Sequence, residues 1–298
     1  MPSITVNGVE LEYQTWGAGN DQPLLLVGGL GVQLIKWTKP FIDALVERGF
    51  HVVAYDSRDV GLSTKFDDWG LADIRAAFKQ ARAKQPVAAP YTLEDMARDG
   101  VELIHALGLD RAHMVGGSNG GAITQVMAIE HPDAVATMVS IMATSGRRGL
   151  PRPVGEAEKW LERPRNPSGT REGAMDEAVT TARIIGSPAY PEDEVSLRAE
   201  AARQYDRCFY PAGNSRHLLA SIASGDSRVA RLGEIAAPTL VIHGREDTLV
   251  PLACAEDVSN SIPGAGILVL DGMGHDYPEA LVGVMAHAIA ENAAKKPV

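Results

Sequence analysis

The chain is short of cysteine and of basic residues, and each shortage argues against a class of protein. Two cysteines in 298 residues do not make a disulfide framework, so we expect Cys208 and Cys254 to be reduced and structural. Lysine and arginine together number 28 against 38 aspartates and glutamates, which gives a formal net charge of −10. Nucleic acids and anionic membrane surfaces require a basic footprint, so neither is expected as a partner.

Long apolar runs and common ligand-binding motifs are also missing. No stretch is long and apolar enough to span a bilayer, and segment 1–16 has neither the basic nor the apolar part of a signal peptide. A cytoplasmic location is therefore predicted. The sequence contains no Cys-x-x-Cys, His-Glu-x-x-His or phosphate-binding Gly-Lys-Ser pattern, so we expect no metal ion and no cofactor.

The patterns that are present predict an α/β fold. Hydrophobic residues at 45% and charged residues at 22% are typical of a globular protein, and the length allows one large domain. Apolar and polar residues alternate around Asn7-Gly8, which predicts an opening hairpin. The continuous apolar run 24–27 is typical of a strand buried on both faces. Such runs alternate with helical patterns up to Ala143, so we predict a mostly parallel sheet with helices on both faces.

This alternation of strands and helices stops between residues 144 and 231. The segment is rich in charges and prolines and contains no apolar run of the buried-strand kind. We interpret it as a helical cap, or lid, inserted into a core formed by residues 1–143 and 232–298. Helices are predicted at 38–48, 71–84, 93–107, 155–162, 171–185, 192–207 and 278–292. Strands return at 238–243 and 266–270.

Segment 111–124, RAHMVGGSNGGAIT, carries the strongest chemical signal. Residues of strand character run up to Gly116, and a pattern typical of a helix begins at Gly120. The Gly-x-Ser-x-Gly between them matches the nucleophile elbow, in which a tight, strained turn exposes a serine hydroxyl. A glycine-rich turn after a strand is often only a turn, but this context makes Ser118 the candidate nucleophile. The N–H of Asn119, which follows it, would point at the developing oxyanion.

A serine hydroxyl needs a base that takes its proton and a carboxylate that orients that base. Asp247 and His275 each follow one of the last two predicted strands, so both are expected at carboxyl ends of the sheet. Glu246 and Asp271 are the alternative acids. The other histidines are interpreted as structural or surface residues: His51, His105, His113, His131, His217, His243 and His287.

Two further loops follow predicted strands. Loop 28–31, Gly-Gly-Leu-Gly, lets backbone approach a ligand closely and can supply a second oxyanion N–H, or it is a plain strand-to-helix turn. Loop 56–63, DSRDVGLS, is interpreted as structural, with Arg58 and the aspartates tying neighbouring strand ends together.

Five motifs resemble landmarks of the α/β-hydrolase fold esterases in family order: VGGLG, YDSRDVGLS, GGSNGG, HGREDTLVP and GMGH. Within that superfamily the chain is most similar to the aclacinomycin methylesterase group, which shares YD-x-RD-x-G-x-S and a Gly-x-Ser-x-Gly followed by small residues and ITQV. The resemblance implies an eight-stranded, mostly parallel sheet with an inserted helical cap. It also implies that Ser118 is the nucleophile, His275 the base and Asp247 its orienting acid.

The same resemblance implies that the N–H groups of Asn119 and Leu30 are the oxyanion donors, with Gly29 as the alternative to Leu30. The sequence departs from the family at both places. Asn119 stands where Met, Leu or Gln is commoner, and Gly28-Gly29 stands where many relatives have His-Gly. These departures leave the three catalytic candidates intact but bear on the substrate.

The predicted activity is hydrolysis of carboxylic esters of small to medium apolar substrates through an acyl-enzyme intermediate. Carbon–carbon bond hydrolysis, lactone opening and perhydrolysis use the same three residues and stay open as alternatives. A ligand receptor without activity is the non-enzymatic alternative, since a fold does not fix function. Haloalkane dehalogenases and epoxide hydrolases are disfavoured because this chain has Ser118 where they carry aspartate. The expected partner is a small ester, and the protein is expected to be a monomer or homodimer.

Overall fold

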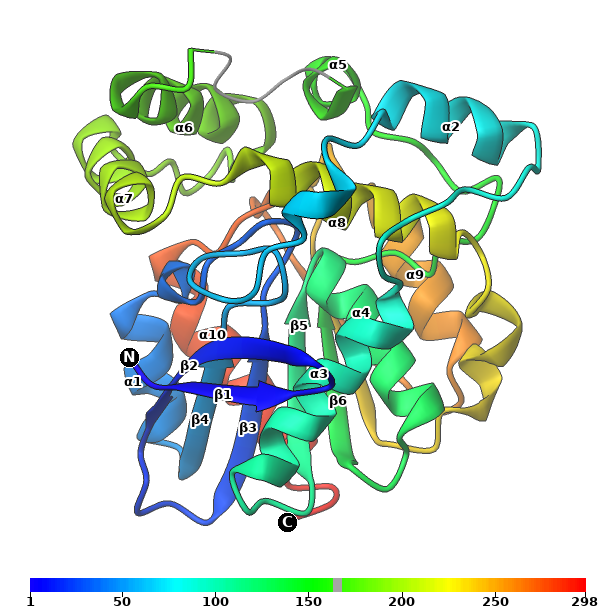
Figure 1. Ribbon diagram of the computed structural model, residues 1–298. Coiled ribbons are helices and arrows are strands. Elements are labelled where there is room, and N and C mark those ends of the chain that lie inside the picture. The colour runs from blue at the N-terminus through cyan, green and yellow to red at the C-terminus, as the bar shows by residue number, and fades with distance from the viewer. Residues whose placement is uncertain (163–167) are drawn as a thin grey trace.

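The computed structural model describes residues 1–162 and 168–298. At its centre is an eight-stranded sheet of order β1-β2-β4-β3-β5-β6-β7-β8 (Figure 1). The strands are β1 Ser3–Val6, β2 Val9–Trp16, β3 Gln22–Val27, β4 Phe50–Tyr55, β5 Ala112–Gly117, β6 Val135–Ile141, β7 Thr239–Gly244 and β8 Gly266–Leu270. Strands β1 and β2 pair antiparallel, as do β2 and β4, and all later neighbours pair in parallel. The predicted α/β class and mostly parallel sheet are confirmed.

The opening hairpin has the turn that its sequence predicts. Asn7 and Gly8 have φ angles of 46° and 74°, and Val6 lies opposite Val9. A two-residue turn with both φ angles positive matches the twist of the strands, and Asn-Gly is the pair that adopts it most readily.

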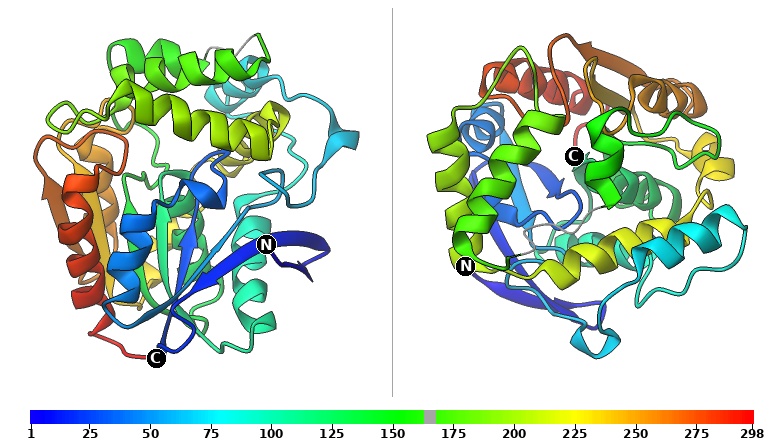
Figure 2. Two further views of the ribbon diagram at one scale, coloured as in Figure 1. Left: turned by 90° about the vertical axis from the view of Figure 1, so that its left-hand side faces the viewer. Right: turned by 90° about the horizontal axis from the view of Figure 1, so that it is seen from above.

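Helices cover both faces of the sheet (Figure 2, left). Leu24 and Leu26 pack on one face with α1 Lys39–Val46 and α10 Val282–Ala293. Leu25 and Val27 pack on the other face, which is covered by α3 Leu93–Ala106, α4 Asn119–Glu130 and α9 Leu252–Ser261. Because alternate side chains of a strand point to opposite faces, the unbroken apolar run of β3 supplies both halves of the core.

Helix ends follow local capping chemistry. Thr38 accepts the Phe41 N–H at the start of α1, and Thr92 forms the expected capping box with Asp95 at the start of α3. Helix α2, predicted at 71–84, spans only Ile74–Arg82, because the Asp73 side chain accepts the Ala76 N–H and begins the helix there. The last predicted helix is divided into a short 3₁₀ turn, η4 Glu279–Leu281, and α10.

A layer of helices lies above the carboxyl ends of the strands (Figure 1). Between β6 and β7 the chain forms α5 Glu156–Glu162, α6 Arg171–Ile185, α7 Glu194–Arg207 and α8 Pro211–Ser224. The first three agree with the predicted helices within two residues, whereas α8 was not predicted. Helix α2 packs against α8, so a segment from before the elbow also belongs to this layer (Figure 1).

The connecting 3₁₀ turns are η1 Leu34–Lys36, η2 Asp67–Trp69 and η3 Val229–Glu234. Both Cys208 and Cys254 are free thiols, as expected. Within residues 1–162 and 168–298, no helix combines the length and apolar character needed to cross a bilayer.

Candidate active site

Ser118 lies in the turn between β5 and α4, with φ 53° and ψ −118°. This backbone conformation is strained for a residue with a side chain. Two of the glycines around it have no room for a side chain. A Cβ on Gly116 would lie 2.2 Å from the Gly120 carbonyl oxygen, and one on Gly120 would lie 2.1 Å from the Val27 carbonyl oxygen. The turn thus has the compact form that the sequence predicts for a nucleophile elbow.

His275 connects Ser118 to Asp247. Its Nε2 lies 2.9 Å from Ser118 Oγ, and its Nδ1 lies 2.7 Å from Asp247 Oδ2. Because an ionised carboxylate only accepts hydrogen bonds, Nδ1 carries the proton and Nε2 presents a lone pair to the serine hydroxyl. The structure therefore brings together the three residues singled out from the sequence, although 157 positions separate Ser118 from His275. They meet because the carboxyl ends of parallel strands share one edge of the sheet.

The carboxylate of Asp247 is buried and fixed. Its Oδ1 accepts the N–H groups of Leu249 at 2.9 Å and Val250 at 2.8 Å, which leaves Oδ2 for His275. The alternative acids are engaged elsewhere. Glu246 accepts the Gly272 N–H at 2.6 Å, and Asp271 forms an exposed ion pair with Arg245.

A second buried histidine lies beside Asp247, where sequence reasoning placed only a structural strand residue. His243 Nε2 donates to the Val250 carbonyl oxygen at 2.7 Å and lies 3.5 Å from Asp247 Oδ2. Burial lowers the pKa of His243, so the neutral ring is favoured at neutral pH. His243 lies four residues before Asp247, and β7 ends between them. This spacing was the sequence signal that could have predicted that the two side chains lie close together.

Asn119, the second expected oxyanion residue, is the first residue of α4. Backbone N–H groups at a helix start are not used within the helix and favour negative charge. The Asn119 side chain accepts a hydrogen bond from Ser221 Oγ of α8 at 2.5 Å, and its Nδ2 is buried without a partner. The helical layer thus reaches down to the residue that follows the candidate nucleophile.

Loop 28–31 lies against the elbow and forms a turn. A Cβ on Gly29 would be 3.4 Å from Ser118 Cβ, so this part of the loop is in contact with the serine. The Val32 N–H donates to the Gly29 carbonyl oxygen at 3.2 Å, and Gly31 has a φ of 67°. Leu30 lies at the second position of this turn, where its own N–H takes no part in the turn hydrogen bond. Leu30 and Gly29 both remain candidate donors.

Loop 56–63 makes part of the expected contacts and others besides. Asp56 accepts the Leu34 N–H of the segment after β3 at 2.7 Å, as expected of a residue that ties neighbouring strand ends together. Arg58 instead binds Asp99 of α3, and Asp59 binds Arg216 of α8. Burial alone would raise the pKa of Asp59, but the Arg216 guanidinium and other hydrogen bonds outweigh it and lower the pKa overall. The loop therefore also anchors two helices, through ion pairs with residues that lie far from it in the sequence.

In the part of the chain that the structure describes, no group of three or more His, Cys, Asp or Glu side chains is arranged to hold a metal ion. The chemistry available at the site is that of a serine hydroxyl, an imidazole, a carboxylate and backbone N–H groups.

Comparison with known proteins shows the family to which the chain belongs. The family model described as alpha/beta hydrolase fold matches residues 22–277, and the chain therefore belongs to that family. Rhodomycin D methylesterase DauP of Streptomyces sp. (strain C5) is 26% identical over 97% of each chain, and a putative carbamate hydrolase RutD of Variovorax paradoxus (strain S110) is 28% identical over 90% of each. The crystal structure of the enol-lactonase from Burkholderia xenovorans LB400 superposes with a TM-score of 0.70 at 25% identity, covering 99% of this chain and 98% of that one. The predicted membership of this hydrolase superfamily and the resemblance to a methylesterase group are confirmed.

Proposed function

We propose that the chain is a serine hydrolase that cleaves carboxylic esters of small to medium apolar substrates. The observation that carries this proposal is the hydrogen-bonded series from Asp247 through His275 to Ser118, with contacts of 2.7 and 2.9 Å. Such a series raises the nucleophilicity of a hydroxyl that is otherwise unreactive at neutral pH.

In the proposed reaction, Ser118 Oγ attacks the ester carbonyl while His275 Nε2 takes its proton. The oxyanion of the tetrahedral intermediate accepts hydrogen bonds from the Asn119 N–H and from the N–H of Leu30 or Gly29. His275 then gives the proton to the leaving alcohol, and Asp247 stabilises the imidazolium in the meantime. A water molecule, activated by the same histidine, releases the acid from the acyl-enzyme. No cofactor takes part in these steps.

An aromatic and an apolar side chain lie beside the elbow. A Cβ on the neighbouring Gly117 would lie 1.6 Å from Tyr277 Oη and 3.8 Å from Met142 Cε, so both side chains lie close to the elbow. Segment 144–231, together with α2, is proposed to act as the cap that covers the substrate. A cytoplasmic location and a monomeric or dimeric state stay predictions.

Methyl esters are the first substrates to test, because one relative is named a methylesterase. A series of methyl and p-nitrophenyl esters of increasing acyl length would be assayed with the wild type and Ser118→Ala in parallel. We expect turnover by the wild type and none above background by the variant. Equal turnover by both would refute the role of Ser118, and turnover by neither would refute ester hydrolysis.

Lactone opening is the second candidate, favoured by the match to an enol-lactonase over nearly the whole of both chains. A lactone is a cyclic ester, so the same steps apply and the leaving alcohol stays attached to the acyl group. Assaying enol-lactones beside open esters under the same conditions distinguishes the two, since the better substrate will have the higher kcat/KM.

A further inference from the structure

Helix α8 contacts both segments that are expected to supply oxyanion donors. Asn214, His217 and Ser221 are spaced three and four positions apart, so they share one face of the helix. Ser221 Oγ donates to Asn119 Oδ1 at 2.5 Å. Asn214 lies over Gly31, because a Cβ on that glycine would be 1.6 Å from Asn214 Oδ1. One face of a helix outside the sheet thus touches both sides of the candidate oxyanion site.

His217 makes the central contact of this face. It is fully buried, and its Nδ1 lies 3.3 Å from the Gly31 nitrogen while its Nε2 lies 2.6 Å from the Arg58 carbonyl oxygen. Since a carbonyl oxygen only accepts, Nε2 carries the proton, and the Nδ1 lone pair accepts the Gly31 N–H. The contact requires a neutral ring, and burial lowers the pKa of His217, which favours that state.

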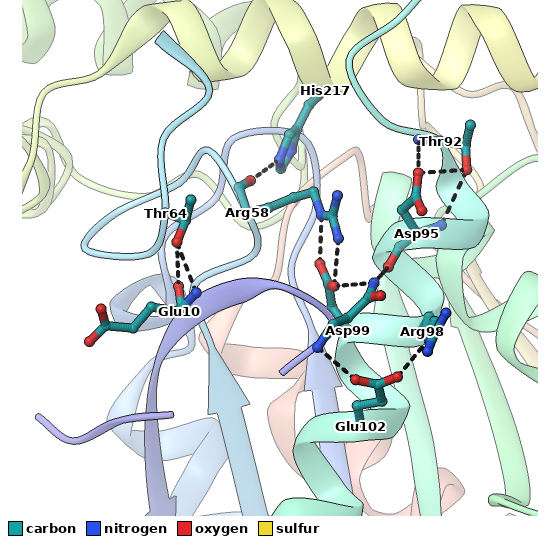
Figure 3. A network of polar contacts seen from close by, with 10 residues as sticks. Glu10, Arg58, Thr64, Thr92, Asp95, Arg98, Asp99, Glu102 and His217 are labelled. Carbon is teal, nitrogen blue, oxygen red and sulfur yellow. Dashed lines mark hydrogen bonds and ion pairs between the residues drawn. The ribbon is translucent and has the colours of Figure 1, made fainter. Parts of the chain in front are cut away.

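The residues that hold His217 are themselves fixed. Arg58 donates through two nitrogens to Asp99 of α3, at 2.7 and 2.6 Å, and Figure 3 shows its side chain pointing toward Asp99 while its carbonyl oxygen faces His217. The preceding residue, Arg216, forms a buried ion pair with Asp59 through two hydrogen bonds of 2.8 and 2.9 Å. The imidazole therefore sits between a fixed loop and a fixed helix, with little freedom to move.

The Gly31 contact fixes one of the two peptides beside Leu30. The Gly29 carbonyl oxygen is held by the Val32 N–H, and in a trans peptide the Leu30 N–H points the opposite way. His217 holds the other peptide of Leu30 through the Gly31 N–H. Gly31 has a positive φ and no side chain, so its backbone is conformationally permissive and the contact with His217 restricts it.

We propose that His217 is a positioning residue for the oxyanion site, acting by accepting the Gly31 N–H so that loop 28–31 keeps its donor N–H directed at the substrate oxygen. This inference rests on the proposed function. Helix α8, which carries His217, would then help to stabilise the transition state as well as to cover the substrate. His217 does not touch the reacting atoms.

Two substitutions separate the two hydrogen bonds of the ring. In His217→Gln the side-chain amide can still donate to the Arg58 oxygen but has no acceptor at the Nδ1 position. In His217→Asn the amide oxygen replaces Nδ1 and can still accept the Gly31 N–H. We expect kcat of His217→Gln to fall about 10- to 100-fold with KM within about twofold, since removing an oxyanion donor outright costs about 10²- to 10³-fold. His217→Asn should recover most of that loss.

His113 offers the matched control, because it is also buried and accepts or donates on both ring nitrogens, to Thr137 and Gln22. It lies five residues before Ser118 on β5, roughly 16 Å away at strand spacing. His113→Gln should therefore leave kcat within about twofold of the wild type. Thermal unfolding of all three variants would show which remain folded at the assay temperature.

A second measurement requires no variant. The hydrogen bond joins two nitrogens, so a ¹⁵N–¹⁵N coupling between the Gly31 amide and His217 Nδ1 should be detectable by NMR in the deuterated, ¹⁵N-labelled wild type. Absence of the coupling, or a His217→Gln variant with wild-type kcat, would overturn the inference while leaving ester hydrolysis intact. An inactive wild type would overturn the proposed function and this inference with it.

Discussion

Helix α8 and the pair α6 and α7 lie in the same layer above the sheet, but different interactions hold them there (Figure 2, right). Helix α8 buries Arg216 and His217, and both make hydrogen bonds to the loop that follows β4. Helices α6 and α7 bury only Val179, Ile185 and Ala202. Surface ion pairs, such as those of Arg198 with Glu172 and Asp176, join them along their length. Their C-terminal ends are tied to the core, because the Ile185 carbonyl oxygen accepts the His275 N–H and Arg207 pairs with the buried Asp56.

The difference indicates how the layer divides between fixed and adaptable parts. A buried ion pair with satisfied hydrogen bonds is costly to break, because loss of one partner leaves an unpaired charge in the interior. Exposed ion pairs contribute little and are screened by salt. We therefore expect α8 to unfold with the sheet, and the N-terminal parts of α6 and α7 to open at a lower free energy.

The largest expected effect is on kcat, and it compares the candidate nucleophile with a surface residue of the helical layer. Ser118→Ala removes the attacking oxygen and should lower kcat by at least about 10⁴-fold, with the unfolding temperature nearly unchanged. Arg198→Ala, in the surface network of α7, should leave kcat within about twofold. Steady-state kinetics of both variants on one ester would test this, and a Ser118→Ala variant with more than a hundredth of wild-type kcat would contradict it.

The next effect concerns stability and compares the two kinds of ion pair directly. Arg216→Met leaves Asp59 buried without its guanidinium and should lower the free energy of unfolding by about 3–5 kcal/mol. Arg198→Met should produce no change beyond the error of a urea titration. Similar losses for the two variants would mean that α8 is no more firmly anchored than α7.

Acid should destabilise the region around the sheet and α8, which contains buried neutral histidines. Burial lowers the pKa of His113 to about 4, and it also lowers the pKa values of His217 and His243. An unfolded histidine takes up its proton near pH 6.5, so below that pH the unfolded chain binds more protons than the native one, and stability falls as pH decreases.

For His113 the loss of stability takes place between about pH 6.5 and about pH 4, and it lowers the free energy of unfolding by roughly 3 kcal/mol. Urea titrations at half-unit steps between pH 7 and 4.5 would measure the slope. His113→Gln should reduce that slope, whereas a stability that is independent of pH over this range would contradict the assignment of neutral buried rings.

The smallest expected effect compares helix caps. Thr92→Ala removes the capping box of α3, which packs on the sheet, and should lower the free energy of unfolding by about 1 kcal/mol. Asp193 caps α7 in the same way, by accepting the Ser196 N–H. Asp193→Ala should affect only the local opening of α6 and α7, seen in amide hydrogen exchange, and should leave the global unfolding transition in place.

The sequence predicted most of the sheet and the three residues of the candidate site, because these depend on local and periodic signals. The apolar run of β3, the capping box of Thr92 and the glycines around Ser118 each act through neighbours in the chain. The meeting of Ser118, Asp247 and His275 then follows from parallel strands, whose carboxyl ends share an edge.

Helix α8 could not be predicted in the same way, since it buries polar residues. Its buried positions include Arg216 and His217, so the apolar periodicity that marks an amphipathic helix is weak. Burial of Arg216 becomes favourable through Asp59, which lies 157 residues earlier in the chain, and through the Gly70 carbonyl oxygen. The proximity of His243 to Asp247 was missed for a related reason, because a histidine on a strand carries no sign of which loop will fold over it. The oxyanion donors and the domain boundaries stay predictions.

The pair α6 and α7 also has a consequence for engineering. Because exposed charges join the N-terminal parts of both helices, whereas their C-terminal ends contact His275 and Asp56, other sequences should be accepted in the N-terminal parts. Libraries aimed at new substrates would therefore retain more folded members if diversity were confined to residues 171–183 and 194–202. The same number of changes in α8 would be expected to yield mostly insoluble protein.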